Sequence, residues 1–474
     1  MLKSSRPCPQ GRVGYKREES GDASKALVFA KWDFADRVQE VIPVRRSKAY
    51  RATEVKQVGL DGLIDGRDGA ECHAGLDVSK DEIMAVLRWS SAEFERPWRA
   101  KNPQELGALV ALLTGVARRC RLTVALEPTG TYGDPLRQTL ADAGLVPHRV
   151  SPKAAHDYAE VFDGVPSQHD GKDAAIVAEL AAQAKSRPWP YEPPSDSDAE
   201  LAYWVDWLDA HQREQVMWLG RLEGLLARHW PEATETLPLS SVTLLRTLER
   251  YGGPAGLASD AAAADQLARW GGRYLKREKI DELLRGATTS LGVRTGAWDV
   301  HRLQSFAREA LSSREQVQES KRQLARLSAS NPVIQAQSAA VGVATACVLW
   351  VHLGDPRHYD CGAAYRKAMG LNLKERSSGR WQGRLMITKR GRSAVRRWLY
   401  FAALRRVRDS AIRPWYEAKK RTDEDRAKRA LVGVMRKLAL ALYQVGACGA
   451  VFESRLLFPG IAARRREQFE EATA

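Results

Sequence analysis

Two apolar runs in the first half of the chain carry acidic residues at their ends. The first run, Cys72–Val78, contains Asp77, and the second ends directly before Glu127. A further pair, Asp170 and Asp173, comes just before an alanine-rich helical pattern, at a spacing that places both on one helix face. Because an unpaired carboxylate in an apolar core costs several kcal/mol, these acids are expected at the edge of the fold.

Convergent carboxylates repel one another unless a cation lies between them. Hard oxygen ligands suit Mg²⁺ or Mn²⁺, so Asp77, Glu127, Asp170 and Asp173 are candidate metal ligands and candidate catalytic residues. For any one of these acids alone, a role as a turn or helix cap is the commoner explanation. Only their combination favours a metal site.

The pattern around the acids is that of an α/β layer fold of the ribonuclease-H type. A meander of three strands precedes a helix that has Pro103 at its first position, and strands and helices then alternate. The expected strands are Cys72–Val78, Glu82–Trp89, Phe94–Ala100, Leu122–Leu126 and Leu145–Val150, with later helices at Leu136–Ala143 and Asp173–Lys185.

In the order Asp, Glu, Asp-x-x-Asp, the chain resembles the DEDD transposases of bacterial insertion sequences. The matching segments are Gly75–Lys80, Glu127–Tyr132 and Asp170–Ala174, and the resemblance extends from about Cys72 to about Phe458. It implies a first domain similar to the RuvC Holliday-junction resolvase and a C-terminal domain that carries a catalytic serine. Members of this family are similar to bridge-RNA-guided recombinases, which implies a structured non-coding RNA that pairs with donor and target DNA.

A basic, glycine-containing stretch near residues 369–391 resembles the serine domain of that family. Ser378, which precedes Gly379, matches the nucleophile, and Ser377 is its nearest rival. The chain has Asn372-Leu373 where a proline is common in the family. By its chemistry alone, a serine in such a loop is more often a phosphate hydrogen-bond donor.

Basic residues around this serine are expected to bind nucleic acid and to neutralise charge on a phosphoryl group. They are Arg376, Arg380, Arg384, Lys389, Arg390, Arg396 and Arg397. The segment from Asp355 to Leu440 holds 24 Lys and Arg against 8 Asp and Glu, and the formal net charge of the whole chain is +16. An excess of one sign this dense indicates a polyanionic partner, most simply nucleic acid.

A chain of 474 residues is too long for one core. The expected divisions are a basic, loosely ordered extension (1–70), a RuvC-like DEDD domain (71–187), a linker with a helical coiled-coil region (188–330), a mostly helical serine transposase domain (331–460) and a tail (461–474).

Two long helical patterns, Glu200–Trp230 and Trp298–Ser328, fit either packing within one chain or an intermolecular coiled coil. The family implies dimerisation through this region. The segment Ala340–Ala344 fits either a phosphate-binding helix-hairpin-helix or a tight turn between core helices.

The longest apolar stretch, Ala339–Leu353, is too short to cross a bilayer, and the six cysteines are scattered. We therefore expect a cytoplasmic bacterial protein, nucleoid-associated when acting, with no membrane partner.

The leading hypothesis is a site-specific DNA recombinase of an insertion sequence that forms a phosphoserine intermediate. It would act as a homo-oligomer, a dimer or a tetramer on DNA, with the acids and the serine meeting between protomers. The alternative is a metal-dependent Holliday-junction-type endonuclease that uses water, and a third possibility is a non-catalytic nucleic-acid scaffold.

Overall fold

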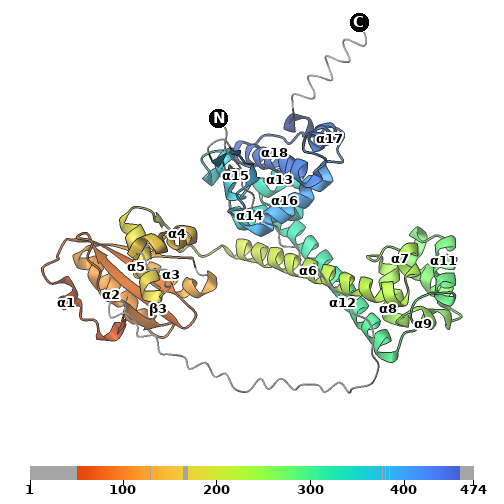
Figure 1. The fold of residues 1–474 in the computed structure, drawn as a ribbon, viewed down its shortest axis with the longest axis horizontal. Coiled ribbons are helices and arrows are strands. Elements are labelled where there is room, and N and C mark those ends of the chain that lie inside the picture. Colours follow the sequence, from red (N-terminus) through yellow and green to blue (C-terminus); the bar gives the residue numbers. More distant parts are fainter. Residues whose placement is uncertain are drawn as a thin grey trace, which may run out of the picture. The chain divides into compact units, whose positions relative to one another are not determined.

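The computed structural model describes residues 51–128, 130–163, 169–375, 377–378, 381–383 and 385–458. The chain divides into two compact units, Met1–Glu192 and Pro193–Ala474 (Figure 1). The predicted tail lies outside the described residues, as do the first 50 residues of the predicted extension.

The first unit is built on one sheet, in which seven strands are seen in the described part of the chain. The sheet order is β1-β4-β3-β2-β5-β6-β7. The strands are β1 (Thr53–Glu54), β2 (Glu71–Val78), β3 (Glu82–Trp89), β4 (Trp98–Lys101), β5 (Arg121–Leu126), β6 (His148–Arg149) and β7 (Arg187–Pro188). Strands β2, β3 and β4 form the predicted antiparallel meander, whereas β5 is parallel to β2, and β6 is parallel to β5. This is the strand arrangement of a ribonuclease-H-type sheet.

Side chains of β3 alternate between the two faces of the sheet, as the pleat of a strand requires. Ile83 and Leu87 belong to a core that also includes α2 (Leu106–Arg119) and α3 (Asp134–Asp142). Met84 and Val86 pack with α5 (Asp170–Ala182) on the other face, where α4 (Pro152–Asp163) also packs against α5. Both faces are therefore covered by helices, which explains why the central strands are apolar along their whole length.

The first unit extends beyond the predicted boundaries at residues 71 and 187. Strand β1 pairs with β4, and α1 (Leu60–Ile64) places a fully buried Ile64 in the core, so residues 53–70 are not a loosely ordered extension. At the other end, β7 pairs with β6 and spans the predicted boundary between the domain and the linker.

Two further differences concern helices. Helix α2 begins at Leu106, so Pro103 lies in the turn before the helix rather than at its first position. Helix α4 was not predicted at all.

Two long helices dominate the second unit. Helix α6 (Asp196–His229) and helix α12 (Ala297–Ser328) pack against each other within one chain. Leu201, Val205 and Leu208 of α6 share a core with Val317 and Leu324 of α12. The apolar stripes of the predicted coiled-coil region are thus buried inside the chain itself.

A small group of helices lies between α6 and α12 in sequence. They are α7 (Glu232–Thr236), α8 (Val242–Tyr251), α9 (Pro254–Ala258), α10 (Ala263–Gly271) and α11 (Arg277–Thr288). The fully buried Trp230 and Leu245 anchor their core, to which Leu226 of α6 and Leu303 of α12 also belong. These helices form a small insertion between the two long helices.

The rest of the second unit is mostly helical. Its helices are α13 (Pro332–Val341), α14 (Val343–Leu353), α15 (Gly362–Ala368), α16 (Ser393–Arg406), α17 (Arg413–Thr422) and α18 (Ala427–Cys448). Four two-residue strands lie between α15 and α16: β8 (Leu373–Lys374), β9 (Ser377–Ser378), β10 (Trp381–Gln382) and β11 (Met386–Ile387). Strand β8 pairs with β11, and β9 pairs with β10.

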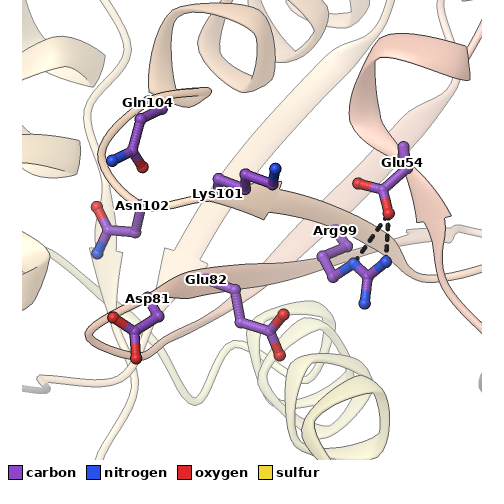
Figure 2. A pocket seen from close by; sticks show the side chains of 7 residues that line it. All are labelled: Glu54, Asp81, Glu82, Arg99, Lys101, Asn102 and Gln104. Atoms are coloured by element: carbon purple, nitrogen blue, oxygen red, sulfur yellow. Dashed lines mark hydrogen bonds and ion pairs between the residues drawn. The ribbon is translucent and has the colours of Figure 1, made fainter.

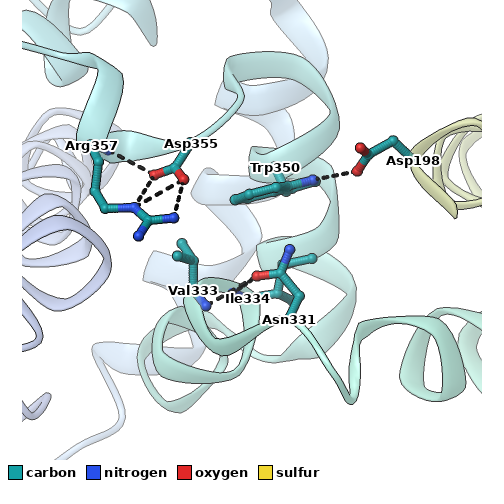
Figure 3. Close-up of polar contacts among 7 residues, drawn as sticks. All are labelled: Asp198, Asn331, Val333, Ile334, Trp350, Asp355 and Arg357. Atoms are coloured by element: carbon teal, nitrogen blue, oxygen red, sulfur yellow. Dashed lines mark hydrogen bonds and ion pairs between the residues drawn. The ribbon is translucent and has the colours of Figure 1, made fainter. Parts of the chain in front are cut away.

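Side-chain contacts fix how α13 and α14 begin and pack (Figure 3). The Asn331 side chain accepts hydrogen bonds from two backbone N–H groups in the first turn of α13, and the Trp350 indole of α14 donates to Asp198 of α6 at 2.9 Å. Gly342, with a φ of 85°, joins the two helices. The hairpin is therefore present between core helices, and its phosphate binding stays a prediction.

Helix α18 is the one described helix that is long and apolar enough, by length and composition, to cross a membrane. The structure uses it as a core helix, because Leu431, Val434, Leu438 and Leu442 are all buried in the main cluster of the second unit. Its apolar character is explained by that burial.

Candidate active site

The four predicted acids come from three neighbouring elements of the first unit. Strands β2 and β5 are parallel, and Leu76 is paired with Leu126. Asp77 and Glu127 are the next residues along these two strands, so both lie at the carboxyl ends of neighbouring strands. Asp170 and Asp173 lie in the first turn of α5, which packs on β2. Negative side chains are stabilised at a helix N-terminus, so this turn suits both acids.

Carboxylate oxygens of Asp77, Asp170 and Asp173 all lie within 4.8 Å of one another. Asp77 and Asp173 are half-buried, whereas Asp170 is exposed. Glu127 is also half-buried, and Asp173 is close enough to raise the pKa of the Glu127 carboxyl. The structure therefore places three of the four predicted acids within 4.8 Å of one another, and Glu127 near enough to interact with them electrostatically but outside that group.

The electrostatics of this cluster disfavour four simultaneous negative charges. Burial, followed by the charges of Asp173, Asp170 and Glu127, raises the pKa of Asp77 to about 7. Burial also raises the pKa values of Glu127 and Asp173. Among the described side chains, none forms an ion pair with any of the four acids.

The donor set fits a hard divalent cation. Only carboxylate oxygens converge among the described residues at this place, and such ligands select Mg²⁺ or Mn²⁺ over softer metals. A cation between the carboxylates would offset the repulsion that raises their pKa values. The residues present are thus compatible with a bound divalent metal ion.

A glycine allows α5 to approach β2 this closely. A Cβ atom built on Gly75 would lie 2.1 Å from the carbonyl oxygen of Ala174 and 2.3 Å from the backbone nitrogen of Ala178. Gly75 is two residues before Asp77 on the same strand, so the backbone contact sets the distance between Asp77 and the acids of α5. In the sequence, Gly75 stands out only as part of a motif, because nothing there identifies the helix that packs on it.

Two side chains fix the first turn of α5. His169 accepts a hydrogen bond from the Gly171 N–H at 3.0 Å and so caps the helix. Lys172, between the two acids in sequence, is 1% exposed, and its Nζ lies 2.6 Å from Asp163 at the end of α4. This buried ion pair joins α4 to the turn that presents Asp170 and Asp173.

A polar pocket of about 630 Å³ lies beside the turn that follows β2 (Figure 2). Its lining residues are Glu54, Asp81, Glu82, Arg99, Lys101, Asn102 and Gln104. Arg99 is paired with Glu54, and the Asn102 side chain donates to the Ser79 carbonyl at 2.8 Å. Asn102 therefore holds the turn that follows Asp77, a role for which the sequence carries no local signal.

The predicted nucleophile lies in the second unit. Ser378 and Ser377 form β9, where Ser378 is paired with Trp381, and both serines are exposed. Lys389 and Arg390 are exposed in the same segment, after β11. Three other predicted nucleic-acid-binding residues, Arg376, Arg380 and Arg384, lie outside the described residues.

Arg396 and Arg397, also predicted to bind nucleic acid, have partners within the unit. Arg396 donates to the Gly391 carbonyl at 2.8 Å. Arg397 pairs with Asp209 of α6, an 8% exposed residue that also accepts from the Trp398 indole at 3.3 Å. Asp209 also pairs with Arg213 of its own helix. The contact with Asp209 holds Arg397 against α6, which indicates a structural role.

Two family profiles match this chain. A family profile for DEDD transposases of the IS110 type, described as "Transposase", matches residues 74–231. A second profile, described as "Transposase IS116/IS110/IS902 family", matches residues 336–417. The first match includes all four acids, and the second includes Ser378 and the basic residues around it.

A protein of Streptomyces coelicolor is 25% identical over 344 residues, which cover 71% of this chain and 84% of the relative. It is described as "Insertion element IS110 uncharacterized 43.6 kDa protein". Among solved structures, a chain of T. thermophilus RuvC in complex with a Holliday junction substrate is similar at 16% identity, with a TM-score of 0.20. That match covers 25% of this chain and 99% of the RuvC chain.

The two family profiles together cover about half of the chain, and they match segments in both of its units. The insertion-element relative agrees with them. The chain therefore belongs to the IS110 family of DEDD transposases, and it is a DNA transposase/recombinase enzyme.

Proposed function

We propose that this transposase is a site-specific recombinase that moves its own insertion sequence by cutting and rejoining DNA strands. The observation that carries the proposal is the group of Asp77, Asp170 and Asp173 oxygens within 4.8 Å of one another. An exposed serine in a strongly basic segment of the second unit supports it further.

A DEDD domain implies a divalent metal, and the four acids would hold it; Mg²⁺ or Mn²⁺ is our proposal for its identity. When bound, such an ion polarises the scissile phosphate and stabilises the leaving oxygen. Glu127, Asp170 and Asp173 supply negative charge around Asp77, which ionises more readily once positive charge is nearby.

Ser378 would supply the nucleophile. Its Oγ forms a bond to phosphorus while the bond from phosphorus to the leaving DNA oxygen breaks, so one phosphodiester replaces another. Attack by a hydroxyl of a new partner strand then frees the serine and rejoins the DNA. The exposed position of β9 gives a DNA strand access to Ser378, and Lys389 and Arg390 offer positive charge for the phosphoryl oxygens.

The test is a search for a covalent protein–DNA adduct. DNA that carries the element ends is incubated with protein and a divalent metal, and the products are separated under denaturing conditions. We expect an adduct with the wild-type chain and with Ser377→Ala, the matched neighbouring variant. No adduct is expected with Ser378→Ala or with Asp77→Asn.

The alternative is a hydrolytic endonuclease in which water attacks the phosphate. It is favoured by one observation: Ser378 lies in a different compact unit from the four acids. If Ser378→Ala still cleaves DNA and no adduct forms with the wild-type chain, the serine mechanism is wrong and this alternative holds.

A structured guide RNA and a homo-oligomer also belong to the proposal. The resemblance to bridge-RNA-guided recombinases and the +16 net charge support an RNA partner beside donor and target DNA. A dimer, or a tetramer on DNA, is proposed as the active assembly. Sequencing of RNA that copurifies with the protein, and the mass of the complex in solution, test these two statements.

A further inference from the structure

Two arginines of the second unit have no counter-charge within the part of the chain that the structure describes. Arg366 lies on α15 and Arg436 on α18, and these two helices pack against each other. Both side chains are half-buried. Among the described residues, no carboxylate pairs with either guanidinium.

Part of each guanidinium is also without a hydrogen-bond acceptor. Arg366 Nε and Arg436 Nη1 are buried atoms with no partner among the described residues. A buried N–H without an acceptor costs about 1–3 kcal/mol, and more when it is charged. Such groups in a native fold call for an explanation, and a bound anion is one that would also offset the two positive charges.

The two positive charges lie close enough to affect each other. The pKa of Arg436 is lowered by burial and then by the charge of Arg366. Like charges in a partly buried place destabilise the fold unless a negative group lies between them.

Other arginines of this unit show what a structural arginine looks like here. Arg397 pairs with Asp209, Arg357 pairs with Asp355, and Arg406 donates to the Ala340 carbonyl at 2.6 Å. Each of these has an internal ion-pair or hydrogen-bond partner, although Arg397 Nη2 is also a buried atom without a hydrogen bond among the described residues. Arg366 and Arg436 differ because no such partner is found among the described residues.

We propose that Arg366 and Arg436 together hold one backbone phosphate of a DNA strand. Arginine forks match the tetrahedral oxygens of a phosphate and form strong charge-assisted hydrogen bonds with them. DNA is the substrate of a transposase, and these arginines lie within the segment that holds the positive excess of the chain.

The place of Arg366 relates this phosphate site to the serine segment. Helix α15 leads through Gly370 into β8, and the Leu371 N–H donates to the Arg366 carbonyl at 3.3 Å. A phosphate held at Arg366 would therefore fix a DNA strand where the segment that carries Ser378 begins. This inference rests on the proposed function, since it assigns a substrate contact in the same reaction.

The test uses Arg366→Met and Arg436→Met in the full chain, with Lys437→Met as the matched control. Lys437 is adjacent to Arg436 and carries the same charge, but it is exposed. Affinity for a short DNA duplex of arbitrary sequence is measured over a range of KCl concentrations, and the melting temperature is measured without DNA.

Each arginine variant is expected to bind DNA about tenfold more weakly. The slope of the logarithm of the binding constant against the logarithm of the KCl concentration should become less steep, by the amount that about one lost phosphate contact gives. Its melting temperature should equal or exceed that of the wild type, because charge repulsion is relieved. Lys437→Met should lose clearly less affinity.

DNA affinity equal to that of the wild type, or no lower than that of Lys437→Met, would overturn the phosphate site. A marked fall in melting temperature would also overturn it, because that result indicates a structural role. If the same titration with an RNA duplex shows a loss of affinity for RNA alone, the DNA phosphate site is wrong as well. If these variants bind normally while Ser378→Ala still abolishes the covalent adduct, only the phosphate site is wrong. If the wild-type chain forms no adduct, the serine mechanism fails whatever the arginines do.

Discussion

Burial and three neighbouring carboxylates act on Asp77 in the same direction. Both make its ionised form unfavourable in the folded protein, and the pKa of its carboxyl is about 7 rather than the usual 3.8. The fold keeps this arrangement at a cost in stability. Such a cost is typical of a place that holds a cation, because the bound ion offsets the repulsion.

A dependence of stability on pH follows for the metal-free protein. Between about pH 4 and about pH 7, folded Asp77 retains a proton that the unfolded chain has lost, so the free energy of unfolding falls as pH rises. We expect urea unfolding in EDTA to give a lower free energy at about pH 8 than at about pH 5. In Asp77→Asn this decrease should be smaller. Equal pH dependence in the two proteins would contradict the raised pKa.

At the residue scale, the nearness of Asp77, Asp170 and Asp173 to one another could be predicted, whereas the partners of the basic residues could not. Asp77, Glu127, Asp170 and Asp173 were noticed because each lies close to one end of a strand or helix, and such elements have a readable period. Arg397 could not be assigned, because its partner Asp209 lies nearly two hundred residues earlier in the chain. A long-range ion pair leaves no local pattern in a sequence.

At the scale of elements, the contact between β2 and α5 determines the geometry of the site. Gly75→Ala would place a methyl group against backbone atoms of Ala174 and Ala178, which cannot move without displacing α5. Overpacking of this kind costs about 1–3 kcal/mol or more. We expect lower stability in denaturant unfolding, together with weaker stabilisation by Mn²⁺, because Asp170 and Asp173 would move away from Asp77.

Gly107→Ala is the control for this substitution. Gly107 lies in α2, and a Cβ atom added there would meet no neighbouring atom within 4 Å. Alanine at this position should therefore be neutral, or should stabilise by up to about 1 kcal/mol through its helix propensity. If Gly75→Ala were as stable as Gly107→Ala and kept its response to Mn²⁺, the close approach of α5 would not matter.

The elements that could be predicted are the long ones. Helices α6 and α12 show many turns of apolar periodicity, and their predicted ends differ from the structure by only a few residues. The sequence could not decide between packing within one chain and packing between chains, because the same apolar stripe serves both. Strands β1 and β7 have only two residues each, too few to show any alternation.

At the scale of the whole molecule, the two units have separate cores. The buried clusters around β2, β3 and α5 contain only residues of the first unit, and the clusters around α6, α12 and α18 contain only residues of the second. The charge is divided as well, since the acids lie in the first unit and the dense positive excess lies in the second. Metal binding and DNA binding can therefore be measured separately.

A fragment of residues 51–192 should fold without the rest of the chain, because its cores are complete within it. We expect cooperative thermal unfolding, and a higher melting temperature in Mn²⁺, since a ligand at about one hundred times its Kd stabilises by about 2.7 kcal/mol. The same fragment with Asp77→Asn should show little of this stabilisation. A fragment that unfolds without cooperativity would show that the first unit depends on the second. Equal stabilisation of both fragments by Mn²⁺ would place the metal somewhere other than between Asp77 and the acids of α5.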